Sequence, residues 1–185
     1  ILSIVGSAII LQGCVAAAVV GVLGGATVAA DKRTVGQQID DQSIEFETYN
    51  ALNKHEGIKE HTNLHVVSLN GSVLIVGQSP NTYLKDLAAK TVSEVRGVEQ
   101  IHNQIRISNT TSITTRSNDI WLTSKVKTAL FGSDKLEATN IKVVTENAEI
   151  FLMGLVSAAE GNEAVEIARN VSGVNRVFKA FEYIE

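Results

Sequence analysis

Residues 64–77, LHVVSLNGSVLIVG, align without a gap on residues 141–154, IKVVTENAEIFLMG, 77 positions later in the chain. Each stretch holds two short runs rich in β-branched residues, separated by a polar turn and ended by a glycine. Asn70-Gly71 predicts a two-residue hairpin turn, because both positions tolerate a positive φ. Ala148 takes the glycine position in the second copy, which predicts a wider or strained turn there. The chain therefore contains two copies of one strand-turn-strand unit.

Apolar residues at helical spacing lie on both sides of each hairpin. Before the second hairpin they predict a helix that is capped by Asn118 or Asp119. After the hairpins, Ser79 and Ser157 are each expected to cap another helix, and a last strand follows. The order of elements is therefore α-β-β-α-β, and it occurs twice.

The order of the strands predicts the kind of sheet. A hairpin is antiparallel, whereas a strand, a helix and a strand in succession indicate a parallel crossover. We therefore expect an α+β fold, in which each copy forms a three-stranded mixed sheet covered by two helices. The copies are expected at residues 40–107 and 118–185, with a polar linker at residues 108–117.

The repeated unit resembles the BON domain. In both copies a hydrophobic helix precedes the hairpin, and the next helix is closed by Val-x-Gly-Val, at residues 95–98 and 171–174. The most specific stretches are NDIWLT at residues 118–123 and FLMGLV at residues 151–156. The resemblance implies a non-enzymatic module of bacterial envelope proteins that is proposed to bind phospholipid. For a tandem pair it implies a periplasmic role in outer-membrane integrity, with links to cell division and to outer-membrane protein assembly.

The first 30 residues carry no charge, whereas all 16 basic and 20 acidic residues lie in residues 31–185. Residues 1–11 form an apolar run of signal-peptide length. A membrane-spanning helix is the alternative, but Gln12, Gly13 and three later glycines interrupt the apolar segment. We therefore expect residues 1–13 to be the remnant of a signal peptide.

Cys14 is the only cysteine, so an intrachain disulfide is excluded. Residues 11–14, LQGC, resemble a lipobox, which implies cleavage before Cys14 and its acylation, for example by palmitate. Val15 stands where an Asp would be a retention signal, and this favours the periplasmic face of the outer membrane. Residues 14–39 are then a lipidated tether. The alternative is a buried thiol in a membrane helix.

The residues that most often carry catalysis give no pattern of an active site. The four histidines all lie in the first copy, and we expect them to be solvated: His55, His61, His65 and His102. Asp40 and Asp41 are expected to be solvated residues at the start of a helix. The sequence contains no glycine-rich phosphate loop or nucleophile elbow. We therefore expect no enzymatic activity, cofactor or metal site, and the net charge of −4 does not suggest a nucleic-acid partner.

The helix before the second hairpin carries apolar and basic residues away from its buried stripe: Ile120, Trp121, Lys125, Lys127 and Phe131. Such a group is suited to contact with an anionic phospholipid membrane. The matching residues of the first copy are polar or acidic: Gln42, Ser43, Glu47, Tyr49 and Asn53. We therefore expect only the second copy to bind lipid. In the alternative, Trp121 packs against the first domain or a partner, and the protein is an adaptor for outer-membrane assembly, division-site or peptidoglycan-remodelling proteins.

Overall fold

The computed structural model describes residues 33–109 and 113–184. The first half comprises α1 (Val35–Asn53), α2 (Glu56–His61), β1 (Asn63–Leu69), β2 (Ser72–Ser79), α3 (Thr82–Ser93) and β3 (Gln100–Ile107). The second half comprises α4 (Ile113–Phe131), a 3-10 turn (Ala138–Asn140), β4 (Ile141–Glu146), β5 (Glu149–Val156), α5 (Ala158–Arg169) and β6 (Arg176–Tyr183). Apart from the short helix α2 and the 3-10 turn, this is the predicted α-β-β-α-β order in both halves. The predicted α+β fold is confirmed.

Each half contains one mixed sheet with the hairpin's second strand in the centre, in the orders β1-β2-β3 and β4-β5-β6. The hairpin pairs are antiparallel, whereas β3 and β6 run parallel to their central strands. Both turns are two residues long, and all four turn residues have a positive φ. Ala148 adopts a φ of 59°, so the second turn is not wider but holds a non-glycine residue in a strained conformation.

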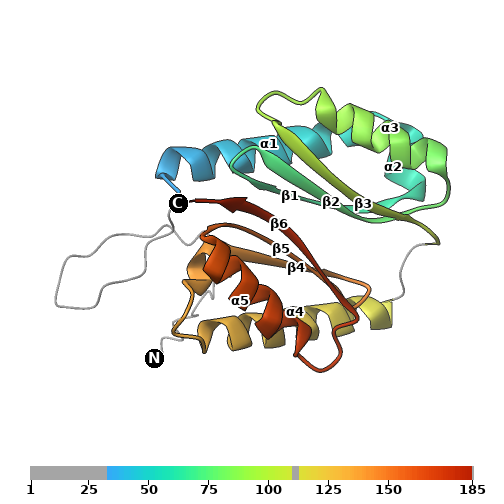
Figure 1. Ribbon diagram of the computed structural model, residues 1–185. Coiled ribbons are helices and arrows are strands. Elements are labelled where there is room, and N and C mark those ends of the chain that lie inside the picture. The colour runs from blue at the N-terminus through green and yellow to red at the C-terminus, as the bar shows by residue number, and fades with distance from the viewer. Residues whose placement is uncertain (1–32, 110–112, 185) are drawn as a thin grey trace, which may run out of the picture.

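The two halves stack as four layers (Figure 1). Helices α1, α2 and α3 cover the outer face of the first sheet, and α4 and α5 cover the outer face of the second. The inner faces of the two sheets lie against each other in the middle of the molecule. Each sheet is therefore covered on both faces.

The central strands show how both faces are used. In β2, Val73 and Ile75 belong to the core beneath the helices, whereas Leu74 and Val76 belong to the core between the sheets. In β5 the same alternation places Ile150 and Leu152 under the helices and Phe151 and Met153 between the sheets. The Phe151 ring stacks on Phe178 at a centroid distance of 5.0 Å. Each half thus has a core of its own, and a third core is shared.

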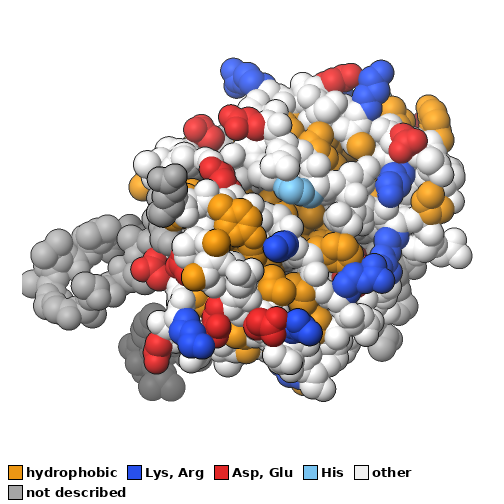
Figure 2. Space-filling view, in the orientation of Figure 1, with side chains coloured by type: hydrophobic (Ala, Val, Ile, Leu, Met, Phe, Trp, Pro, Cys, Tyr) orange, Lys and Arg blue, Asp and Glu red, His pale blue; other side chains and the backbone are white. Residues whose placement is uncertain are grey.

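Polar contacts surround the shared core. Lys142 on β4 donates to the backbone oxygen of Ser68 at 2.6 Å and lies 3.6 Å from the carboxylate of Glu45. Arg106 on β3 forms an ion pair with Glu149 on β5, whose side chain is almost completely buried. On the face shown in Figure 2, hydrophobic side chains gather between the two halves, with Lys and Arg side chains among them. The shared core and these contacts join the halves into one body.

Two helices begin earlier than the boundaries expected from the sequence. Helix α1 begins at Val35, because Thr34 and Gln37 form a capping box there. Helix α4 begins at Ile113, within the segment expected as a linker. Asn118 and Asp119 therefore lie inside a helix, and their predicted role as caps is wrong.

The second helix of each half is capped differently in the two copies. Ser157 caps α5 as predicted, in a capping box with Glu160. Ser79 does not cap α3, because the chain continues by two residues and the side chain of Asn81 accepts the hydrogen bond from Leu84 N. The Ser79 hydroxyl instead donates to the backbone oxygen of Asn81 at 2.8 Å.

Candidate membrane-binding face

Helix α4 buries one face and exposes the residues expected to contact lipid. Leu122, Val126 and Leu130 are at most 1% exposed and pack on the second sheet. The large hydrophobic residues of the opposite side are open to solvent: Ile120 is 70% exposed, Trp121 57% and Phe131 64%. Trp121 does not pack against the first domain, as the alternative interpretation of the sequence required. It belongs instead to an apolar surface that is open to solvent.

Lys125 is half-buried and lies over the indole of Trp121. Its Nζ lies 4.3 Å from the centroid of the Trp121 ring and donates a hydrogen bond to the backbone oxygen of Ser172 at 2.8 Å. Ser172 precedes Gly173 in the loop that ends α5, so the lysine bridges α4 and this loop. A shallow hollow beside the ring is lined by Trp121, Ser124, Lys125, Thr128, Ala129, Val171 and Ser172. The ammonium group and the ring therefore form one preorganised surface.

Lys127 and Phe131 lie on another side of the same helix. Both are exposed, and they border a smaller hollow together with Ala138, Thr139 and Ile141. The face of α4 thus presents two hollows, each with one lysine and one aromatic ring. We call these five residues the α4 face: Ile120, Trp121, Lys125, Lys127 and Phe131.

A buried carboxylate fixes α4 next to this face. Asp119 is 6% exposed and accepts hydrogen bonds from the backbone nitrogens of Asn147 and Ala148, each at 2.8 Å. These nitrogens belong to the β4–β5 turn, so the residue immediately before Ile120 ties the helix to the hairpin. Asp119 is a structural residue that positions the α4 face.

Asp41 makes the equivalent contact in the first half, and the prediction that it is a solvated residue at a helix start is wrong. It is 2% exposed and accepts from Ser68 Oγ at 2.7 Å, Asn70 N at 2.9 Å, Gly71 N at 3.3 Å and Arg33 Nη1 at 2.8 Å. Burial alone raises the pKa of the Asp41 carboxyl, but the hydrogen bonds from Asn70, Ser68, Gly71 and Arg33 outweigh it and hold the pKa below the ordinary value of 3.8. Asp40, its neighbour, is exposed as expected.

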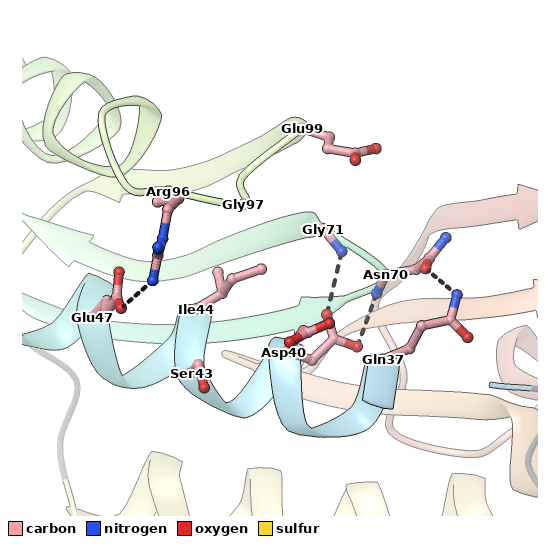
Figure 3. Close-up of a pocket in the computed structure, with 11 residues that line it drawn as sticks. Gln37, Asp40, Ser43, Ile44, Glu47, Asn70, Gly71, Arg96, Gly97 and Glu99 are labelled. Carbon is pink, nitrogen blue, oxygen red and sulfur yellow. Dashed lines mark hydrogen bonds and ion pairs between the residues drawn. The ribbon is translucent and has the colours of Figure 1, made fainter. Parts of the chain in front are cut away.

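In the first half, a polar cavity of about 510 Å³ takes the place of the hollow beside Trp121 (Figure 3). Ser43 and Glu47, which match Trp121 and Lys125, line it together with Arg96 and Glu99. Arg96 lies 3.9 Å from Glu47, and both side chains are exposed. The first domain therefore has a hydroxyl and a carboxylate where the second domain has the indole of Trp121 and the ammonium group of Lys125, as the sequence predicted.

Helix α1 nevertheless has exposed hydrophobic residues that were not predicted from the sequence. Val35, Ile39 and Phe46 are 73%, 58% and 68% exposed. Two of them precede the expected start of the first domain, and Phe46 matches Ser124 rather than a residue of the α4 face. The earlier helix start brings them onto one surface.

Two of the four histidines are not solvated as predicted. His61 and His65 are exposed, whereas His55 and His102 are half-buried and lie 3.1 Å from the hydroxyls of Thr91 and Ser72. Burial lowers the pKa of His102. Within residues 33–109 and 113–184, no group of three or more His, Cys, Asp or Glu side chains is arranged to hold a metal ion. In the same ranges, no helix is both long and apolar enough to cross a membrane.

The comparison with known families agrees with the fold. A family model described as the BON domain matches residues 40–109 and 118–185. The chain belongs to the BON domain family. The predicted tandem of BON domains is thereby confirmed.

Curated relatives extend the similarity over the whole chain. The chain is 42% identical over 182 residues to the outer membrane lipoprotein DolP of Haemophilus influenzae, covering 98% of this chain and 94% of that protein. It is 37% identical to the 21 kDa hemolysin of Actinobacillus pleuropneumoniae, over 86% of this chain and 82% of that protein. It is 29% identical to the osmotically-inducible protein Y of Escherichia coli, over 83% and 77%.

These relationships confirm the predicted class of outer-membrane BON lipoprotein. Neither the BON family nor these three relatives bears the name of an enzyme. Cys14, the predicted site of acylation, lies outside the described residues.

Proposed function

We propose that this BON protein is a non-enzymatic lipoprotein that supports envelope integrity and cell division, and that its second BON domain binds anionic phospholipid through the α4 face. Cys14 carries the acyl anchor in this proposal, and the tether brings the domain to the bilayer. If Cys14→Ser leaves processing and outer-membrane localisation unchanged, the role of Cys14 is refuted.

One observation carries the lipid proposal: Trp121 is exposed on the outer side of α4 with the ammonium group of Lys125 at its ring. Tryptophan favours the boundary between headgroups and acyl chains, and lysine is attracted to anionic headgroups. Each lysine near such a surface contributes about 1 kcal/mol, so Lys125 and Lys127 together contribute about 2 kcal/mol. Because this contribution is modest, the free protein should bind only weakly. The anchor strengthens binding by keeping the face at high effective concentration beside the membrane.

Flotation with phosphatidylglycerol and phosphatidylcholine vesicles tests the proposal, with residues 33–185 as the soluble fragment. All three hydrophobic cores lie within this fragment. We expect weak binding to phosphatidylglycerol vesicles that salt reduces, and little binding to phosphatidylcholine. Trp121→Glu, or Lys125→Glu with Lys127→Glu, should remove this binding while the circular dichroism spectrum stays unchanged.

Tyr83→Glu is the matched control, because Tyr83 is an aromatic residue of α3 that is 72% exposed, in the first BON domain. This variant should bind vesicles as the wild type does. If Tyr83→Glu weakens binding as much as Trp121→Glu, or if the wild type does not bind, the α4 face is not a lipid site. The adaptor function, in which an exposed apolar patch binds a protein of outer-membrane assembly or peptidoglycan remodelling, then takes first place.

A further inference from the structure

The outer side of α1 carries an apolar stripe whose residues belong to none of the three hydrophobic cores of the described residues. Val35, Ile39 and Phe46 are separated by four and seven residues, so they lie within about 40° of one another around the helix axis. Ile44, Thr48 and Leu52 are buried on the opposite side of the helix. All three residues of the stripe are more than half exposed, with Val35 the most exposed at 73%. We call Val35, Ile39 and Phe46 the α1 stripe.

Two carboxylates lie to one side of the α1 stripe, about 100° from it around the helix axis. Asp40 and Glu47 are seven residues apart, both are exposed, and both line the polar cavity, as Figure 3 shows. The stripe and the acidic hollow therefore lie on neighbouring sides of α1, with Ser43 between them. Arg96 is the basic side chain among the residues that line the hollow.

The equivalent helices of the two BON domains carry opposite charge. Helix α1 contains four acidic residues and no basic residue, which gives −4. Asp41 is buried against Arg33 and Glu45 lies 3.6 Å from Lys142, so Asp40 and Glu47 are the exposed carboxylates. Helix α4 contains three basic residues, Arg116, Lys125 and Lys127, and one acidic residue, the buried Asp119, which gives +2. The exposed surface of α1 is therefore apolar and acidic, whereas that of α4 is apolar and basic.

We propose that the α1 surface of one copy of this protein binds the α4 face of a second copy. The α1 stripe would pack against Ile120, Trp121 and Phe131. Lys125 and Lys127 lie on opposite edges of that apolar group, so Asp40 and Glu47, which share one side of the stripe, would face one of these two edges. Charge complementarity favours this occupant over an anionic bilayer, because a membrane that attracts the two lysines repels the two carboxylates.

This contact uses the surface that we propose for lipid, so the two interactions exclude each other. A copy whose α4 face lies on anionic lipid cannot present that face to a neighbour. Anionic lipid should therefore disperse the assembly, and self-association should shield Trp121 where anionic lipid is scarce. The lipid content of the membrane then sets the fraction of associated protein.

The contact should be weak for free protein. A pairing of two helix surfaces is smaller than the interfaces of stable complexes, which bury about 1,600 Å² in total. Anchoring of every copy in one membrane raises the effective concentration and reduces the rotational freedom that association must remove.

The test uses residues 33–185 and two charge-reversal variants, measured by sedimentation equilibrium up to millimolar concentration at low salt. Asp40→Lys with Glu47→Lys makes both surfaces basic, and Lys125→Glu with Lys127→Glu makes both acidic. Since two charge pairs change from attraction to repulsion, each variant alone should self-associate at least about tenfold more weakly than the wild type.

An equimolar mixture of the two variants should restore association, because the basic α1 surface of one matches the acidic α4 face of the other, and the wild-type pair also remains. Recovery on mixing cannot come from unfolded variants, and a contact that uses other surfaces would not show it. A monomeric wild type, or a mixture that stays monomeric, overturns the proposal.

The lipid function can fail or hold independently of this result. Asp40→Lys with Glu47→Lys leaves the α4 face intact, so it should still float with phosphatidylglycerol vesicles. For the wild type, adding these vesicles should move protein from the assembly onto the vesicles, whereas phosphatidylcholine vesicles should leave it associated. If Ile39→Asp instead weakens flotation with the phosphatidylglycerol vesicles and leaves self-association unchanged, the α1 stripe is a membrane contact and the proposal is wrong.

Discussion

Replacement of Asp41 by Asn tests whether the buried carboxylate holds the first BON domain together. The four hydrogen bonds to Asp41 divide equally: Oδ1 accepts from Ser68 and Gly71, and Oδ2 accepts from Asn70 and Arg33. An amide keeps one acceptor oxygen, and its NH₂ group cannot accept from the backbone nitrogen that faced the other oxygen, although the Ser68 hydroxyl can turn to accept from it. A hydrogen bond to a charged group contributes about 1.5–3 kcal/mol, and the remaining bonds also lose their charged acceptor, so Asp41→Asn should lower the free energy of unfolding by about 3 kcal/mol.

Asp119 and Asp40 supply matched comparisons. Asp119 accepts two hydrogen bonds, one on each oxygen, so Asp119→Asn loses one and should cost about half as much, roughly 1.5 kcal/mol. Asp40 is exposed, so Asp40→Asn should change the free energy of unfolding by less than about 0.5 kcal/mol. Urea unfolding at neutral pH and dilute protein measures all three. A loss below about 1 kcal/mol for Asp41→Asn, or a larger loss for Asp119→Asn, would refute the reasoning.

The contribution of Asp41 should also depend on pH. Its pKa is lower in the folded protein than in the unfolded chain, so the ionised carboxylate stabilises the fold above the unfolded pKa of about 3.9. This stabilisation is lost as the pH falls through the folded pKa. The difference in stability between the wild type and Asp41→Asn should therefore shrink below about pH 4. A difference that stays constant down to pH 2 would contradict the assignment.

Two further predictions concern the turns and the shared core. Ala148→Gly should raise the free energy of unfolding by about 0.5–1 kcal/mol, because a glycine adopts the positive φ of 59° without strain. Gly71→Ala should lower the free energy of unfolding, because the added Cβ would lie 3.0 Å from the backbone oxygen of Gly97. Thermal unfolding measures both, and no increase for Ala148→Gly would contradict the prediction. A fragment of residues 113–185 should keep the core beneath α4 and α5 but expose Val144, Phe151 and Met153 of the shared core. This fragment should therefore bind a hydrophobic dye and self-associate. A soluble monomer that binds no dye would show that the second domain does not need the shared core.

Two features of the structure, the shared core and the buried aspartates, have signals in the sequence. Residues 73–76 and 150–153 are runs of four hydrophobic residues without polar alternation, which is typical of a strand that is buried on both faces. Asp41 and Asp119 stand at equivalent positions of the two copies, 78 residues apart, and this recurrence pointed to a shared role. By contrast, the six-residue helix α2 between α1 and β1 has no side-chain cap that would predict it from the sequence.

The sequence by itself determined the repeat, the order of strands and helices, the mixed sheets, the BON family and the residues of the α4 face. These features depend on local periodicity and turn chemistry, which a chain carries in each segment. Only the tertiary structure decided that the two sheets share a core, that Asp41 is buried, and that Trp121 faces solvent rather than the first domain. Hydrophobic periodicity specifies which side of a helix or strand avoids water, but what covers that side depends on how distant segments pack.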